Sequence, residues 1–327
     1  MNTAGIDVGA RALSLVIRKN GKAGKERCFE NDGKGHKQIL AALKKAKVDR
    51  VCLEATGVYH FDLAVSLSDA GPFGLMVLNP KAANNFACAI MSRTKTDPID
   101  AGILAEYAER MEFIPWARPK DAFLAIRACA RRLAALTKQS TQSKNQYHAL
   151  NSVESTPDFI LKDVALTIRQ LKAQVEQMRS STLALISEDQ ELSEILVILK
   201  SVTGIAEVSA IQIMGEILVL PEDMQAKQWV AMAGLDPKHH QSGSSVNKKA
   251  RISKVGNRYL RIALYMPALS ASTHDRHIRG YYLHLIEDRG LKKMQAICAV
   301  MRKLLHAIHG MLKNRTTFDN TRFYVMD

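Results

Sequence analysis

The feature that most constrains the fold is the order of short apolar runs in the first third of the chain. Two runs, at residues 3–8 and 13–18, alternate apolar residues with small or polar ones and predict a hairpin that turns at Gly9 and Ala10. Beyond them, strand patterns alternate with helical patterns. The expected elements are strands at 3–8, 13–18 and near 26–30, a helix at 36–45, a strand at 50–54, a helix near 61–70 and a strand at 74–78.

Periodicity by itself predicts only that this region is an α/β domain. Three successive strands followed by alternating helices and strands is, more specifically, the order of a ribonuclease-H-like sheet. We therefore expect residues 1–115 to form a domain of that kind.

The middle of the chain is expected to form an antiparallel pair of long helices. Apolar residues recur at alternating intervals of three and four, the rhythm of a coiled coil. They are Leu161, Val164, Ile168, Leu171, Val175 and Met178. An earlier helix, at about residues 122–150, begins with the same rhythm, and Pro157 suits the first turn of the second helix. This predicts a helical hairpin over residues 116–190, which is either a spacer or an arm for self-association.

The last part of the chain, residues 191–327, is again mostly helical in pattern, with breaks at 203–206, 235–247 and 288–290. No apolar run approaches the roughly 18 residues of a membrane span, and the first ten residues lack the pattern of a secretory leader. The 5 cysteines are scattered without the spacing of a disulfide framework or a zinc site. We therefore expect a protein of the reducing cytoplasm, associated with the nucleoid and not with a membrane.

The charge balance indicates a polyanionic partner. The chain holds 46 Lys and Arg against 32 Asp and Glu, a formal net charge of +14, and such an excess favours nucleic acid. Residues 238–261 contain seven Lys or Arg, two His and no carboxylate. The expected nucleic-acid contacts are Arg93, Lys95, Lys238, Lys248, Lys249, Arg251, Lys254, Arg258 and Arg261.

Four carboxylates of the α/β region are candidates for a metal site. Asp7 lies inside an apolar strand pattern and Glu54 ends another, and a buried carboxylate is costly unless a cation pairs with it. Asp97 and Asp100 are three residues apart, so a helix places them on one face. Purely structural explanations remain open, because Asp7 can cap a turn and Asp97 before Pro98 can cap a helix. Together, the four residues supply the hard oxygen ligands of a two-ion Mg²⁺ site for phosphoryl transfer, with Mn²⁺ as a substitute.

A serine loop lies within the basic run, at Ser242-Gly243-Ser244-Ser245. It is either a flexible loop that contacts phosphates or the source of a nucleophile that attacks phosphorus with the help of nearby cations or a metal. His239 and His240 precede it and are candidate proton acceptors or ligands. The spacing alone does not choose between these interpretations.

Taken together, these segments resemble a known family: the DEDD transposases of bacterial insertion sequences, which are relatives of the pilin-gene invertase. The resemblance covers essentially the whole chain, and its segments are specific in their order and spacing. They are Gly5-Ile6-Asp7, Glu54-Ala55-Thr56-Gly57, Lys95-Thr96-Asp97 with Asp100-Ala101, Ala233-Gly234-Leu235 with Pro237, the serine loop, and Ala263-Leu264-Tyr265-Met266-Pro267-Ala268.

The resemblance implies three domains and a role for each. Residues 1–115 would be a RuvC-like catalytic domain, 116–190 a coiled-coil hairpin, and 191–327 a mostly helical transposase domain with the catalytic serine. The family implies that Asp7, Glu54, Asp97 and Asp100 form the metal-binding tetrad and that Ser242 becomes covalently joined to cleaved DNA. It also implies a non-coding bridge RNA that pairs with donor and target DNA, and a homo-oligomer, from dimer to tetramer, in which one protomer's tetrad faces another's serine.

Three rival functions remain distinguishable from this one. A RuvC-like junction nuclease would use the same carboxylates with metal-activated water and would form no protein–DNA adduct. A sugar kinase or actin-like ATPase is suggested by Gly5-Ile6-Asp7-Val8-Gly9, but we find no second glycine-rich phosphate loop and no reason for the charge of +14. A non-catalytic nucleic-acid-binding protein would leave the four carboxylates without a purpose. The sequence therefore favours a site-specific DNA recombinase.

Overall fold

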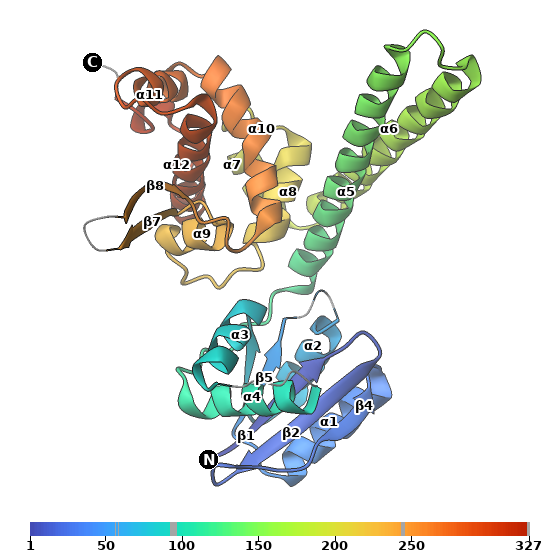
Figure 1. Ribbon diagram of the computed structural model, residues 1–327, viewed down its shortest axis with the longest axis vertical. Coiled ribbons are helices and arrows are strands. Elements are labelled where there is room, and N and C mark those ends of the chain that lie inside the picture. Colours follow the sequence, from blue (N-terminus) through green and yellow to red (C-terminus); the bar gives the residue numbers. More distant parts are fainter. Residues whose placement is uncertain (56, 58, 92–96, 243–245, 326–327) are drawn as a thin grey trace. The chain divides into compact units, whose positions relative to one another are not determined.

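A computed structural model describes the chain except residues 56, 58, 92–96, 243–245 and 326–327; for residues 97–98, 239–242 and 246–250 it describes the backbone alone (Figure 1). The predicted contacts Arg93 and Lys95 thus lie outside the described residues. The chain forms two compact units, residues 1–118 and 119–327. The expected helical hairpin falls within the second unit.

The first unit is built on a mixed sheet with β1 (Asn2–Val8) at its centre. β1 pairs antiparallel with β2 (Ala12–Lys19) and parallel with β5 (Arg50–Glu54), and β5 pairs parallel with β6 (Gly74–Leu78). Two short strands, β3 (Lys22–Ala23) and β4 (Arg27–Glu30), both pair antiparallel with β2 and form the outer edge. This topology, antiparallel on one side of β1 and parallel on the other, confirms the predicted ribonuclease-H-like, RuvC-like sheet.

Helices cover both faces of this sheet (Figure 1). Because successive strand residues point to opposite faces, Ala4, Ile6 and Val8 pack against α1 (Gly33–Lys45) and α2 (Phe61–Ala70). On the other face, Cys52, Met76 and Leu78 pack with residues of α3 (Pro80–Ala89) and α4 (Asp97–Arg110). The odd-numbered residues of β1, including Asp7, therefore belong to the α4 face.

The second unit begins with two long helices, α5 (Asp121–Asn151) and α6 (Asp158–Ser187), which pack against each other as a hairpin (Figure 1). Thr182 interrupts the heptad rhythm of α6 and is nevertheless buried. Its hydroxyl donates to the Met178 carbonyl at 2.6 Å, so no polar hydrogen is left without a partner. The first turns of α5, with Phe123 and Ile126, are part of the core of the C-terminal region.

The rest of this unit is largely helical, as predicted, with one hairpin of strands. Its elements are α7 (Gln190–Lys200), α8 (Glu207–Ile217), α9 (Ala226–Ala233), β7 (Pro237–Ser242), β8 (Val246–Ile252), α10 (Arg258–His274), α11 (Arg276–Glu287), α12 (Lys293–Asn314) and a short 3-10 turn, Asn320–Arg322. The strand β7 and the first two residues of β8 lie in the break predicted at 235–247. The rest of β8 lies where a helical pattern was predicted, so that prediction is wrong there. No described helix is long and apolar enough to cross a lipid bilayer.

Candidate functional site

The parallel pairing of β1 with β5 sets two of the predicted carboxylates side by side. The register joins Ile6 to Leu53, so the next residues, Asp7 and Glu54, occupy neighbouring positions at the carboxyl ends of the two strands. Adjacent strands lie about 4.8 Å apart. Both carboxylates are partly buried, on the face that α4 covers.

Helix α4 approaches β1 closely because Gly5 has no side chain. A Cβ atom at Gly5 would stand 2.0 Å from the carbonyl oxygen of Ala101 and 2.4 Å from the amide nitrogen of Ala105. One step back along the same face, the Thr3 hydroxyl donates to the Ala105 carbonyl at 2.9 Å. As β1 advances toward its carboxyl end, its contacts therefore move toward the start of α4.

The same spacing places the beginning of α4 near the end of β1. Two strand residues advance about 6.6 Å and four helical residues advance about 6 Å. Thr3 lies at Ala105 and Gly5 at Ala101, so two residues further along β1 Asp7 lies level with the first turn of α4. That turn begins at Asp97 and contains Asp100, which is partly buried. The backbone thus directs Asp7, Glu54 and the first turn of α4 to one corner of the sheet; the side chain of Asp97 is outside the description.

The donor set of this corner suits a hard divalent ion, because carboxylate oxygens are the ligands that such ions prefer. Burial, and next to it the charge of Glu54, raises the pKa of the neighbouring Cys52 thiol to about 12. Among the described side chains, which exclude that of Asp97, no three or more His, Cys, Asp or Glu groups gather closely enough to hold an ion. The backbone supplies the arrangement, and the described side chains do not yet form a complete ligand set.

The strands β7 and β8 precede and follow the serine loop in the sequence and pair with each other (Figure 1). Ser242 is the last residue of β7 and pairs in register with Val246, the first residue of β8. The predicted residues His239, His240, Lys248 and Lys249 lie on these two strands, and their side chains are outside the description. The candidate nucleophile therefore stands at the turn end of a basic β-hairpin.

The five predicted cations of the second unit whose side chains are described divide into two groups. Four are exposed, as a nucleic-acid contact requires: Lys238, Arg251, Lys254 and Arg258. Arg261 is partly buried instead, and its guanidinium donates to the Ala233 carbonyl at 2.7 Å. Burial, and then the charge of Arg258, lowers the pKa of Arg261. Arg261 thus holds α10 onto the end of α9, whereas the other four face solvent.

Sequence reasoning missed a groove at the base of the hairpin. It has a volume of about 640 Å³ and is formed by residues of β7 and β8 together with the start of α12. Met294, Cys298 and Arg302 contribute to it from α12. No local sequence pattern predicts this groove, because its two walls, the β7–β8 hairpin and the start of α12, are separated in the sequence by α10 and α11.

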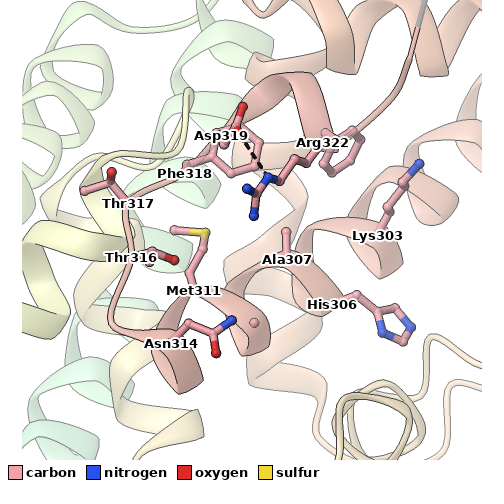
Figure 2. A pocket seen from close by; sticks show the side chains of 12 residues that line it. Lys303, His306, Ala307, Met311, Asn314, Thr316, Thr317, Phe318, Asp319 and Arg322 are labelled. Carbon is pink, nitrogen blue, oxygen red and sulfur yellow. Dashed lines mark ion pairs between the residues drawn. The ribbon is translucent and has the colours of Figure 1, made fainter.

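Figure 2 shows another hollow of the second unit, about 330 Å³ in volume, between the end of α12 and the segment that follows it. Lys303, Met311, Asn314 and Arg322 are among its lining residues, and Arg322 forms an ion pair with Asp319 at 3.2 Å. None of the predicted site residues lines this hollow, and we assign it no part in the chemistry.

Comparison with known families identifies two domains in the chain. Residues 4–151 match the DEDD transposase model, described as Transposase, and residues 197–283 match the model described as Transposase IS116/IS110/IS902 family. The two matches define an enzyme that cleaves and joins DNA. The chain is a transposase of the IS116/IS110/IS902 family, with a DEDD domain first and the second family domain after the helical hairpin. A DEDD domain implies a divalent metal ion and a DNA substrate.

Curated relatives and solved structures extend the comparison. The pilin gene-inverting protein of Moraxella bovis is 29% identical over 268 residues, which are 82% of this chain and 81% of that protein. The pilin gene-inverting protein of Moraxella lacunata is 29% identical over 272 residues, with the same coverage. The RuvC structure of Thermus thermophilus matches with 18% identity and a TM-score of 0.27 and covers 33% of this chain and 96% of that one. The two Moraxella proteins confirm the predicted resemblance to the pilin-gene proteins.

Proposed function

We propose that this transposase breaks and rejoins DNA strands at specific sites through a carboxylate tetrad, Asp7, Glu54, Asp97 and Asp100, and a covalent intermediate on Ser242. The observation that carries the proposal is the register that sets Asp7 beside Glu54, with the first turn of α4 directed to the same corner. Carboxylates directed to one corner of a sheet are the ligands with which a DNA-cleaving enzyme would hold divalent ions.

The tetrad would hold Mg²⁺, with Mn²⁺ as a substitute and two ions as the expected number. When bound, the ions stabilise the charge that develops on the attacking and leaving oxygens. Carboxylates suit this task because they are hard ligands that stay ionised at neutral pH.

Ser242 would supply the nucleophile. Its hydroxyl oxygen attacks the phosphorus while the bond from phosphorus to the leaving sugar oxygen breaks, so the strand becomes esterified to the serine. The hydroxyl proton passes to an acceptor, for which His239 and His240 are the candidates, and the leaving oxygen takes up a proton. Attack by a sugar hydroxyl of the partner strand reverses these steps and restores a phosphodiester. A nuclease that uses water would lose this bond energy and would have no need of the serine.

The tetrad is tested with Asp7→Ala and Asp100→Asn in a DNA cleavage assay with Mg²⁺. Both variants should lose cleavage and keep DNA binding, because the carboxylates are not part of the basic surface. Asp62→Asn is the matched control, since Asp62 is an exposed carboxylate in the first turn of α2, which covers the opposite face of the sheet. Full cleavage by either tetrad variant would refute the assignment.

The serine is tested by trapping the reaction before rejoining. The native chain should retain DNA covalently at residue 242, and Ser242→Ala should retain none. An adduct that persists in this variant but disappears in Ser244→Ala or Ser245→Ala would move the nucleophile. Cleavage without any adduct would instead identify a junction nuclease that uses water.

The proposed partners are donor and target DNA, a non-coding bridge RNA, and further copies of the chain. The charge of +14 suits a protein that binds nucleic acid mainly through contacts with the phosphate backbone of the nucleic acid. If base pairing with the RNA chooses the sites, recoding the RNA should redirect recombination without a change in the protein. Site-specific recombination by RNA-free protein would contradict this part of the proposal.

A shared active site accounts for the proposed oligomer, because two duplexes must be cut and exchanged. The heptad seam of α6 packs on α5 within one chain, so self-association would use other surfaces of the hairpin, such as exposed Phe159 and Leu166. Mixed oligomers of Asp7→Ala and Ser242→Ala test the sharing. A site built in trans restores an adduct on the Asp7→Ala chain, whereas a site built within one chain restores none.

A further inference from the structure

The groove at the base of the β7–β8 hairpin has an apolar floor and is lined in part by β7, the strand that ends at Ser242. Buried or half-buried apolar side chains form the floor: Leu235, Ile252, Leu291, Cys298 and Ala299. The volume of about 640 Å³ lies within the range of small-molecule sites, about 300–1,000 Å³. The groove is therefore large enough for a nucleobase with its sugar.

Four cations surround this floor: Arg251, Lys254, Lys292 and Arg302. All four are exposed, and none forms an ion pair with a carboxylate of the described residues. Among the described residues, the groove lining contains no Asp or Glu. Burial raises the pKa of Cys298, and the nearby charge of Lys254 partly opposes that rise. The rim is thus strongly positive around an apolar depression.

We infer that this groove binds one unpaired nucleotide of the DNA strand on which Ser242 acts, with the base on the apolar floor and the neighbouring phosphates on the four cations. The inference rests on the proposed function for the identity of that strand. Bases become accessible to such a pocket only outside the duplex stack. An apolar protein segment fits the same site less well, because it would bury the cations without counter-charges.

The position of the groove along the hairpin sets its distance from the serine. Pro237 lines the groove and Ser242 ends the same strand, so the two are five residues apart, or about 17 Å at about 3.3 Å per residue. A stacked DNA strand advances about 3.4 Å per nucleotide. The bound nucleotide would accordingly lie about five positions from the scissile phosphate, and fewer if the strand is extended.

Photocrosslinking locates the bound base in the full-length protein. The probe is a single-stranded DNA of about 20 nucleotides, longer than most single-strand sites of about 4–16 nucleotides, with one 5-iododeoxyuridine. Tryptic mapping should place the crosslink in residues 294–302, which end at Arg302. Crosslinks confined to residues outside the groove, which Leu235, Ile252 and Leu291 also line, would overturn the inference. So would crosslinking by the ribonucleotide form of the probe alone, which would assign the groove to RNA.

Matched substitutions separate the groove from the general basic surface. Met294→Glu places a carboxylate on the groove, and Val197→Glu makes the same change at a comparably exposed site on α7; the two side chains are 56% and 63% exposed. Met294→Glu should weaken binding of the single-stranded probe at least tenfold, and Val197→Glu less than twofold. Equal effects would overturn the inference. Unchanged probe binding with an altered oligomeric state in Met294→Glu would identify an interface between copies instead.

The rim is tested through salt dependence. Lys254→Gln and Arg302→Gln should each reduce the slope of log affinity against log salt by about 0.7, the value for one phosphate contact on a single strand. Unchanged slopes would contradict the phosphate contacts. Ser242→Ala should keep the crosslink while losing the adduct. If no adduct forms in the native chain but the crosslink holds, the proposed function fails and the groove remains a single-strand site.

Discussion

Glu216 on α8 is a buried charged residue of the C-terminal region. Glu216 is 1% exposed. Its carboxylate accepts hydrogen bonds from the Arg131 guanidinium at 2.9 and 3.3 Å. It also accepts a 2.6 Å bond from the amide of Asn257, the residue that caps α10. Arg127 lies 3.8 Å away. One carboxylate therefore ties together α5, α8 and the start of α10, the helix that follows the serine hairpin.

Glu216→Ala should destabilise the second unit by about 3 kcal/mol. Removing one partner of a buried ion pair costs about 3–5 kcal/mol. We expect the lower end of that range because the side chains of Arg127 and Arg131 are 20% and 27% exposed, so water can solvate the released guanidinium groups. Glu216→Gln keeps the shape and loses the charge, and should cost about 2 kcal/mol.

The assay is urea unfolding followed by tryptophan fluorescence. Trp229 is buried in the C-terminal core, whereas Trp116 packs against the core of the first unit. A Trp116→Phe background therefore makes the signal specific to the second unit. With a urea slope of about 3 kcal/mol per M, appropriate to a unit of this size, Glu216→Ala should lower the midpoint by about 1 M.

Glu207→Ala is the matched control, because Glu207 lies on the same helix and pairs with Lys200 and Arg179 at a partly exposed site. An exposed pair of this kind contributes about 0–1 kcal/mol. The reasoning would be refuted if Glu216→Ala shifted the midpoint no further than Glu207→Ala.

Two further predictions concern the first unit, observed through Trp116 in a Trp229→Phe background. Gly5→Ala should lower the free energy of unfolding by at least about 3 kcal/mol, because its Cβ would meet the α4 backbone at 2.0 Å. The control is Gly102→Ala, where nothing lies within 4 Å of the new Cβ, and it should stabilise α4 by about 0.5–1 kcal/mol. Equal effects of the two variants on the urea midpoint would contradict the close packing. Burial lowers the pKa of His36 against the opposing charges of Asp62 and Asp32. The unfolded state therefore binds more protons just below the ordinary pKa of 6.5, and stability should fall as pH drops through that value. His36→Gln should flatten the pH dependence of the midpoint, and an unchanged profile would count against the assignment.

The sequence by itself determined the order and type of the elements in the first 78 residues, apart from the two-residue strand β3. The strand Arg50–Glu54, the helix Phe61–Ala70 and the strand Gly74–Leu78 have the bounds that their patterns predicted. Such patterns are local, because alternation with period 2 or 3.6 reports which face of one element is buried. The family resemblance also came from residues alone, since it depended on short segments in a fixed order.

Only the tertiary structure decided which residues far apart in the sequence come into contact. The candidate carboxylates Asp7 and Glu54 were named from their types and places, but their proximity follows from the parallel register of β1 with β5 and from the helix seated on Gly5. The β7–β8 hairpin was missed because its residues are basic and polar, without the apolar alternation of a strand, so it is defined by pairing between strands. Glu216 carries the pattern of an ordinary helical glutamate, and its burial depends on arginines 85 and more residues away. Contacts of this kind depend on which surfaces meet after folding, and no local period encodes them.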